Sequence, residues 1–569
     1  MPLDSSHKFL LQLDELKTQF GAGPAKTIER LLTRLRKQTI SDAETLMRLH
    51  ETLLFLRAYP QSKHIVQETE LILRQFPRWI GEATTQEVDL DALDHPEISG
   101  IAGRTVVDTF SFYVVRDLVR RYPREVGFYW DWFEDENRLG DTWPRFMPLL
   151  EEDASVEANI PYRAWLQAAR GKTPELNWLI ERFNRLPMND SAKAELYNSQ
   201  KLSVEWTPAY SSTRTGMLLP AELRSGPIFY HREPLLQRRD VSLVDELRKP
   251  PPRLEKLSKS DGQAILNLSR DASTTRYREL YGFTHGDAVR VLKAELGRGV
   301  DLFVMGLPPN KRLPLRAYHS AMIFKNQVPI GYFEGLSLCE RMESGFNLYY
   351  TFREGETAWL YAKTLNVMRN LLGVTTFSLD PYQVGYENEE GIESGAFWFY
   401  RKLGFRPTDR LLLKLAEQEE VKIQSRKGYR TSPATLRKLA RSPMVYELNR
   451  RRAGDWDHFQ VRRIGFAVQH EMARKFDGDS EKMRTQALQR LSKIAKRRLT
   501  YAERKIFSDF AVVLLLIPDL AEWSREEKRS LLQIIDSKAG GDEANYLQLM
   551  QNHIKFRRAL IDLGSREPS

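Results

Sequence analysis

The sequence predicts a mixed α/β domain in the middle of the chain, with a largely α-helical region on each side. Leu and Ile recur at three- and four-residue steps over residues 27–60, which is typical of amphipathic helices. Between residues 317 and 382, alternating apolar segments typical of strands surround one segment with helical spacing. Beyond residue 430 the spacing is again helical and the segments are basic. We therefore expect an α/β fold class with helical flanks.

Two polar segments that contain proline predict the domain boundaries. A chain of 569 residues is too long for one hydrophobic core, so two to four domains are expected. Residues 248–262 contain three consecutive prolines, and residues 416–438 are charged and include a Ser-Pro pair. The predicted parts are a mainly helical region over 1–247, an α/β domain over 263–415 and a basic helical domain over 430–569.

Charge and cysteine content limit the classes of partner and site. The formal net charge is +10, which permits an anionic partner such as nucleic acid, a phosphorylated cofactor or a membrane surface. A single cysteine, Cys339, excludes an intrachain disulfide and a cysteine-ligated zinc site. The longest apolar run starts at Phe510 and stops at Pro518, and the first residues show no signal-peptide pattern, so we predict a cytoplasmic protein without a membrane span.

The elements of the central domain follow from local patterns. Residues 317–338 alternate around a turn at Lys325-Asn326, as in a β-hairpin. Residues 356–373 have helical spacing and end at Gly373, a residue suited to a left-handed helix stop. The remaining predicted elements are a strand over 345–352, a strand over 374–382 and a helix that ends at Gly404.

The helix before Gly404 has a clear physical pattern. Phe397, Tyr400 and Leu403 share one face at three-residue spacing, and Ser394 stands where an N-cap is expected. Phe405 can fold back against the last turn. A buried structural helix is sufficient to explain these residues.

The same residues also resemble a family signature. Ala396, Tyr400, Gly404 and Phe405 resemble the Ala-x-x-x-Tyr-x-x-x-Gly-Phe segment near the end of GNAT-superfamily acyltransferases, and the resemblance covers roughly residues 265–412. It implies a central GNAT-like mixed sheet and transfer of an acyl group, most simply acetyl, from acyl-CoA to an amine. In that mechanism Tyr400 protonates the departing thiolate.

The resemblance also implies a site for the cofactor, acetyl-CoA or another acyl-CoA. In the family, a loop that opens a helix holds the pyrophosphate on backbone N–H groups. The stretch "FREGETAWLYAKTL" matches that loop, with Glu356 where the family has its central glycine. A carboxylate there disfavours pyrophosphate unless it turns away or pairs with a cation. The implied cofactor-binding residues are Arg353, Glu354, Gly355, Glu356, Thr357, Ala358, Asn388 and Ala396.

Transfer to an amine also requires a base. Glu334, on or just after the second hairpin strand, and Asp380, at the end of the strand that follows the loop-bearing helix, are the candidates. The resemblance also implies that residues 276–292 lie in early helices that shape the acceptor pocket, and His285 of this segment is a further candidate because imidazole titrates near neutral pH. Each has a structural alternative: an exposed strand residue for Glu334, a turn residue for Asp380 and a loop residue for His285.

Two further hypotheses remain open. The domain could have kept the fold without the cofactor, as an interaction or nucleic-acid-binding protein whose basic C-terminal helices contact RNA or another polyanion. It could also use aminoacyl-tRNA as the acyl donor. No metalloprotease, P-loop or Gly-x-Ser-x-Gly motif points to another enzyme class.

Overall fold

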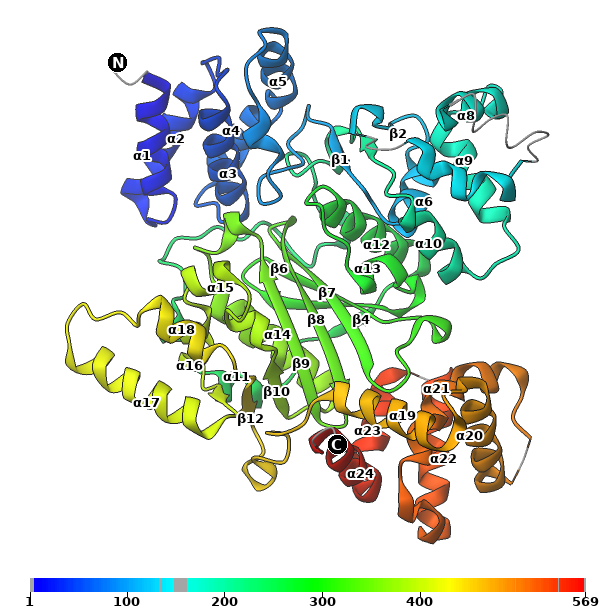
Figure 1. Cartoon of the computed structure of the whole chain (residues 1–569). Helices are drawn as coiled ribbons and strands as arrows, with labels where there is room; N and C mark the ends of the chain where they lie inside the picture. Colours follow the sequence, from blue (N-terminus) through cyan, green and yellow to red (C-terminus); the bar gives the residue numbers. More distant parts are fainter. Residues whose placement is uncertain (1–4, 133–135, 148–160, 497, 541, 567–569) are drawn as a thin grey trace.

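A nine-stranded sheet forms the centre of the molecule, as the computed structural model shows (Figure 1). The structure describes residues 5–132, 136–147, 161–496, 498–540 and 542–566. The predicted mixed α/β class with helical flanks is confirmed. The strand order is β11-β12-β10-β9-β8-β7-β6-β5-β4. The strands are β4 (Leu254–Lys256), β5 (Val291–Gly297), β6 (Val300–Met305), β7 (Ala317–Lys325), β8 (Val328–Leu338), β9 (Arg341–Leu348), β10 (Thr376–Leu379), β11 (Arg406–Pro407) and β12 (Met444–Glu447).

Among the described residues, only one neighbouring pair of strands in this sheet is parallel. β9 and β10 run parallel, and every other paired neighbour is antiparallel. Helix α14 (Thr357–Leu372) connects the two parallel strands, because parallel neighbours need a crossover. It ends at Gly373, which has φ 72° as predicted. The helix packs on the sheet through Tyr361, whose ring lies 5.0 Å from that of Phe346.

The predicted hairpin is confirmed, with its turn one residue later than expected. β7 and β8 pair from Ala317↔Ser337 to Lys325↔Val328. Asn326 and Gln327 form the turn with φ of 47° and 71°. Two consecutive positive φ values match the type I′ turn that the twist of a hairpin favours.

Five helices form the first hundred residues and pack on the sheet region. They are α1 (Ser5–Leu16), α2 (Ala22–Leu35), α3 (Ala43–Ala58), α4 (Lys63–Leu73) and α5 (Phe76–Thr85). α3 is buried along most of its length, from Leu46 to Ala58. Its buried side chains belong to the same hydrophobic core as the central sheet. These helices are therefore an integral part of the central body.

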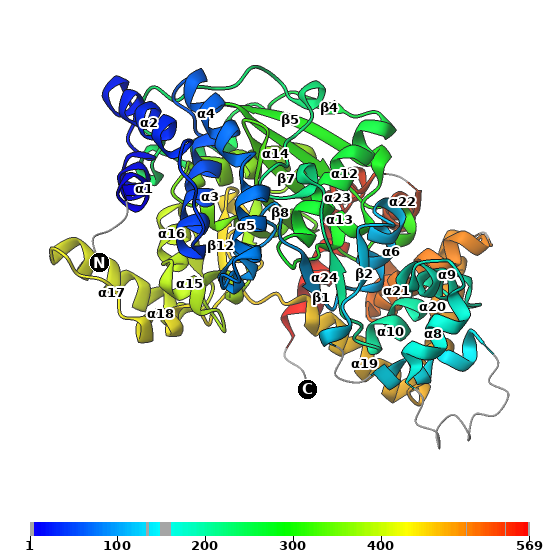
Figure 2. The same ribbon diagram turned by 90° about the horizontal axis from the view of Figure 1, so that it is seen from above.

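Residues 106–206 form a unit with its own hydrophobic core, centred on Phe112, Phe183 and Trp206. It contains a small sheet of order β1-β3-β2. Its elements are β1 (Val106–Asp108), α6 (Phe112–Arg121), β2 (Val126–Phe128), α8 (Tyr162–Arg170), α9 (Glu175–Arg185), α10 (Asp190–Ser199) and β3 (Val204–Trp206). Figure 2 shows this unit well apart from α1 and α2.

The central sheet extends beyond both predicted limits of the α/β domain, 263 and 415. β4 lies within the proline-containing segment, and β12 inserts between β10 and β11 after a helical excursion. The charged residues after 415 continue a helix, and a four-residue strand such as β12 has no detectable period. The helices of this part are α11 (Leu243–Arg248), α12 (Lys259–Thr274), α13 (Tyr281–His285), α15 (Glu389–Glu393), α16 (Ala396–Lys402), α17 (Arg410–Ser425) and α18 (Pro433–Leu439).

Further helices complete the chain and carry much of its positive charge. They are α19 (Val461–Phe476), α20 (Ser480–Ala495), α21 (Tyr501–Leu515), α22 (Arg525–Gly540), α23 (Glu543–Asn552) and α24 (Ile554–Ser565). α23 packs against the sheet side, where the Tyr546 hydroxyl donates to the carbonyl oxygen of Leu315 at 2.6 Å. In the part of the chain that the structure describes, no helix combines the length and apolar character needed to span a bilayer.

Candidate functional site

β9 and β10 pair over only three residues and then separate. Arg341, Met342 and Glu343 lie beside Thr376, Phe377 and Ser378, whereas β9 continues to Leu348 along β8. From Ser344 onward, β9 therefore has no β10 partner. Because side chains alternate along a strand, Ser344 and Gly345 face opposite sides of the sheet. We call the position of Ser344 and Gly345 on β9, where β10 ends beside them, the β9–β10 divergence.

Tyr400 lies on the α14 side of the β9–β10 divergence. Its side chain is 5% exposed, and its ring lies 5.5 Å from the ring of Tyr361. The Tyr361 and Ser344 hydroxyl oxygens are 3.0 Å apart. Burial raises the pKa of Tyr400 above its ordinary value, so the phenol keeps its proton at neutral pH. Within the part of the chain that the structure describes, the Tyr400 hydroxyl makes no hydrogen bond.

The helix that carries Tyr400 is built largely as predicted. Phe397, Tyr400 and Leu403 are all buried, Gly404 has φ 103°, and the Phe405 N–H donates to the Tyr400 carbonyl oxygen at 3.2 Å. The predicted N-cap is wrong. α16 begins after Gly395, which has φ 69°, while Ser394 ends the preceding short helix α15.

Glu334 lies on the opposite side of the sheet at the same position along β9. It pairs with Gly345 across β8 and β9 and accepts a short hydrogen bond from the Tyr318 hydroxyl. Burial raises the pKa of Glu334, with an opposing effect of that hydrogen bond. Glu334 and Tyr400 therefore approach the β9–β10 divergence from opposite faces.

The structure gives two other predicted residues local roles. Asp380 is exposed and accepts a 2.9 Å hydrogen bond from the Tyr382 N–H, which caps the 3₁₀ turn Pro381–Val384. Asn388 caps α15 through the Gly391 N–H at 3.2 Å. Ala396 is the first residue of α16. Asp380 therefore has the turn-forming role that was the structural alternative to a catalytic base. Asn388 caps α15, the short helix before α16.

The loop at residues 353–358 differs from the open anion site that the resemblance implies. Glu354 pairs with Lys17, the residue after α1, at 2.8 Å, and Arg353 pairs with Glu390 at 2.5 Å. A Cβ atom at Gly355 would lie 2.3 Å from the Tyr59 hydroxyl. The remaining loop residues are also engaged: the Thr357 hydroxyl donates to the Arg353 carbonyl oxygen, and Ala358 is buried. The N-terminal helices thus cover this loop.

Glu356 itself occupies the positive end of α14. Its side chain is fully buried and pairs with Arg298 at 2.6 Å and Lys325 at 3.3 Å. It also accepts a hydrogen bond from the Leu236 N–H. Burial lowers the pKa of Lys325 to about 7 despite the opposing effect of Glu356. A buried carboxylate with two cationic partners fills the place expected for a pyrophosphate, so the residues present do not fit that group.

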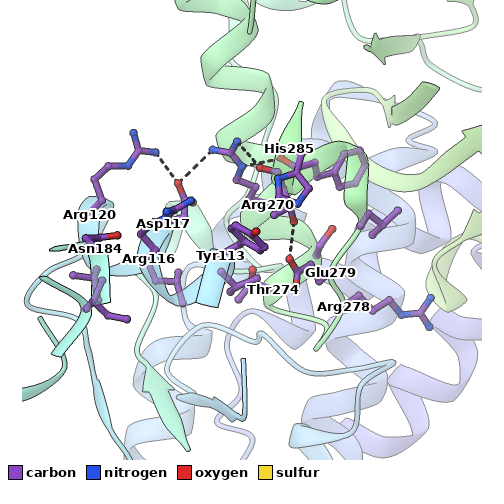
Figure 3. Close-up of a pocket in the computed structure, with 18 of the residues that line it drawn as sticks. Tyr113, Arg116, Asp117, Arg120, Asn184, Arg270, Thr274, Arg278, Glu279 and His285 are labelled. Carbon is purple, nitrogen blue, oxygen red and sulfur yellow. Dashed lines mark hydrogen bonds and ion pairs between the residues drawn. The ribbon is translucent and has the colours of Figure 1, made fainter. Parts of the chain in front are cut away.

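A cavity of about 480 Å³ lies between α6, α12 and α13 (Figure 3). Asp117 projects from α6 and pairs with Arg120 at 2.6 Å and with Arg270 at 3.3 Å. His285 lines the cavity, and burial together with nearby Lys311 and Arg270 lowers its pKa to about 4. His285 is therefore neutral near pH 7 and is a weak base. The segment 276–292, which the resemblance associates with an acceptor pocket, supplies one wall of this cavity. Sequence reasoning missed the wall from α6, because α6 and α12 are far apart in the chain.

Helix α13 separates the cavity from the face of β8 that carries Glu334. Phe283 of α13 lines the cavity, and its ring is 6.3 Å from that of Tyr332. Arg278 also lines the cavity and donates to the Tyr332 hydroxyl at 3.3 Å. Tyr332 is two residues from Glu334 on β8. The wall formed by Arg278 and Phe283 thus separates the cavity from the strand that carries the candidate base.

Neither the scan against protein-family models nor the searches of curated proteins and of solved structures find a match to this chain. Within the described ranges, no group of three His, Cys, Asp or Glu side chains is placed to hold a metal ion.

Proposed function

We propose that this chain is an acyltransferase of GNAT-like fold that transfers an acyl group to an amine at the β9–β10 divergence. The observation that carries the proposal is that Glu334 pairs with Gly345 on one face of β9, while Tyr400 packs on Tyr361, whose hydroxyl meets that of Ser344 on the other face. The order hairpin, strand, α14, strand and α16 supports it, because the resemblance implies the same order. The Tyr-x-x-x-Gly-Phe segment begins on α16, which packs against α14 through Tyr400 and Tyr361, and ends just after that helix.

The two side chains have complementary chemistry for this reaction. The amine nitrogen forms a bond to the acyl carbon, and the bond from that carbon to the leaving group breaks. Glu334 accepts the proton that the amine loses, because a carboxylate with a raised pKa is a better base near neutral pH. Tyr400 donates its hydroxyl proton to the leaving group as the bond to the acyl carbon breaks, and the resulting tyrosinate takes a proton from water before the next turnover.

The resemblance implies an acyl-CoA donor. The loop at residues 353–358, however, is closed by buried contacts and does not offer a pyrophosphate site. Glu356 and Tyr59 occupy the region where the backbone N–H groups of α14 would meet a pyrophosphate. We derive no step through CoA phosphates for this reason. Acetyl-CoA stays in the proposal as a thioester donor whose binding is to be measured.

The second candidate is transfer from an aminoacyl-tRNA, in which the leaving group is a ribose hydroxyl. The buried Glu356 ion pairs favour this candidate, since such a donor needs no pyrophosphate at α14. The third is a protein that keeps the fold without catalysis and binds RNA or another polyanion. The same ion pairs favour it, while a Tyr400 hydroxyl without a hydrogen bond among the described residues favours catalysis.

A transfer assay with two labelled donors separates these candidates. The purified chain is incubated with a pool of amines and either radiolabelled acetyl-CoA or radiolabelled aminoacyl-tRNA, and label in the amine fraction is counted. Label from acetyl-CoA supports the first donor, and label from aminoacyl-tRNA supports the second. No label from either donor would contradict the acyltransferase proposal.

Glu334→Gln is expected to remove the acidic limb of the pH–rate profile. A carboxylate base loses activity as it is protonated, and burial places this limb above the ordinary range of glutamate. The rate should fall by about 100-fold. Glu246→Gln is the matched control, because Glu246 is a buried carboxylate on α11 that pairs with Lys249 and Lys363, each at 2.8 Å. An acidic limb that persists in Glu334→Gln would remove Glu334 from the mechanism.

A further inference from the structure

The C-terminal helices form a large groove with an excess of positive charge. It has a volume of about 950 Å³ and lies between one face of α19, the end of α21 and the end of α24. A neighbouring hollow shares Glu471, Lys475, Arg490 and Leu515 with it and extends it along α20. We call the two together the α19 groove. Its cationic residues are Arg463, Arg474, Lys475, Arg490, Lys493 and Arg566.

Only one carboxylate lines the α19 groove, among the residues that the structure describes. Glu471 pairs with Arg474 at 2.8 Å and with Lys475 at 2.5 Å. These two cations remain 69% and 52% exposed, so they are accessible to a ligand as well. The field in the groove is therefore positive and favours an anionic partner.

The floor of the α19 groove is apolar and carries an aromatic side chain. Leu515, Leu516 and Pro518 line it from the end of α21 and the turn that follows. Phe466 of α19 lies in the same groove and is 48% exposed. An exposed phenylalanine beside cations matches the stacking platforms of proteins that bind single-stranded nucleic acids.

The spacing along α19 fits a short length of sugar-phosphate backbone. Arg463, His470 and Arg474 lie on one face of the helix, at steps of seven and four residues. Arg463 and Arg474 are eleven residues apart, which corresponds to about 16 Å at 1.5 Å per residue. Cations therefore flank the apolar floor over the length of several nucleotides.

We propose that the α19 groove binds a single-stranded segment of a nucleic acid, with cations on the phosphates and Phe466 stacked on a base. A duplex would offer the phosphates but not the base faces that an apolar floor requires. RNA and DNA share this backbone chemistry, and the experiment distinguishes them. The inference does not depend on acyl transfer, because it rests on the C-terminal helices alone.

Fluorescence anisotropy with labelled 12-mers of uridylate and of thymidylate tests this inference on the full chain. Saturable binding is expected to weaken as salt rises, because bound phosphates release counterions. Preference for the uridylate strand identifies RNA as the natural class, and equal affinity identifies backbone recognition alone. Failure of both 12-mers to bind at low salt, or equally strong binding of a 12-base-pair duplex, would overturn the proposal.

Three variants separate this groove from the general charge of the protein. Arg474→Gln/Lys475→Gln/Lys493→Gln is expected to lower the affinity about tenfold and the salt slope by about two, because each neutralised phosphate of a single strand adds about 0.7 to that slope. Glu471→Gln should raise affinity, since it removes the carboxylate that faces the strand. Phe466→Ala should lower affinity with an unchanged salt slope, because stacking releases no counterions.

The matched control removes three exposed cations elsewhere, Lys414→Gln/Lys427→Gln/Arg430→Gln on α17 and the loop after it. Its affinity should stay within about twofold of the unmodified protein. An equal loss of affinity in this control would mean that net charge alone attracts the strand, and the groove would be ruled out. Thermal unfolding of each variant checks that all of them are folded, and catalysis is measured separately, so failure of one proposal leaves the other intact.

Discussion

Glu356→Gln is expected to lower the free energy of unfolding by about 3 kcal/mol or more. The substitution leaves the buried Lys325 ammonium without its carboxylate, and removing one partner of a buried ion pair typically costs about 3–5 kcal/mol. Arg298 adds less to this destabilisation, because it is 27% exposed and can turn to water. Urea unfolding at about pH 5.5 measures the effect, because Lys325 of the unmodified protein is then charged in the folded state.

The neighbouring carboxylate provides a matched control. Glu354 pairs with Lys17 at 2.8 Å but is 59% exposed, so Glu354→Gln should cost less than about 1 kcal/mol. The double variant Glu356→Leu/Lys325→Met should recover much of the stability, because it removes both buried charges together. Equal stability of Glu356→Gln and the unmodified protein would contradict the buried ion pair and reopen the loop as an anion site.

The loss of unfolding free energy in Glu356→Gln is also expected to depend on pH. The folded-state pKa of Lys325 is about 7, below its ordinary value of 10.5, so folding releases a proton between these values and stability rises with pH across that window. Removing the carboxylate lowers the folded pKa further, because Glu356 acts to raise it. The loss of stability in Glu356→Gln should be largest well below pH 7, should shrink as pH rises toward 7, and should be constant above it, because Lys325 is then neutral in both folded proteins. A loss independent of pH would mean that Lys325 does not titrate as described.

Tyr400→Phe is expected to slow acyl transfer by about 100-fold with little change in donor KM, since general acid catalysis contributes about 10²–10⁴-fold. The substitution removes only a hydroxyl that has no protein partner within the described residues. Stability should therefore change little, because no buried hydrogen bond is removed. Steady-state kinetics and thermal unfolding of the same preparation separate the two effects.

A second tyrosine in the same region provides the control for Tyr400. Tyr446 of β12 packs against Phe405 with ring centroids 5.6 Å apart, on the side away from the β9–β10 divergence. Tyr446→Phe should retain the unmodified rate. Equal rates for Tyr400→Phe and Tyr446→Phe would show that Tyr400 is a structural residue of α16.

Local patterns in the sequence were sufficient to predict the middle of the fold. The hairpin of β7 and β8, helix α14 with its stop at Gly373, and the buried face of α16 all follow from alternation, helical spacing and glycine positions. Each of these signals is contained within a short stretch of chain. The strands β4, β5, β6 and β12 are not predicted: the start of β5 falls in a segment expected to be helical, and β4 and β12 have only three and four residues.

The closed loop could not be predicted, because it depends on contacts between distant segments. Glu356 meets Lys325 from 31 residues away, and Gly355 meets Tyr59 from the N-terminal helices. The one available signal was Lys325 itself, a cation at the end of an apolar strand that needs a buried partner. The fold brings Glu334 and Tyr400 to one position on β9, whereas Asp380 and Asn388 cap local turns.

The most direct test of the central claim is label transfer to amines by the unmodified protein and Tyr400→Phe in parallel, from acetyl-CoA and from aminoacyl-tRNA. The account predicts that the unmodified protein labels an amine from at least one donor, and that Tyr400→Phe is about 100-fold slower with that donor. Absence of transfer from both donors, or equal rates for the two proteins, would contradict acyl transfer at the β9–β10 divergence.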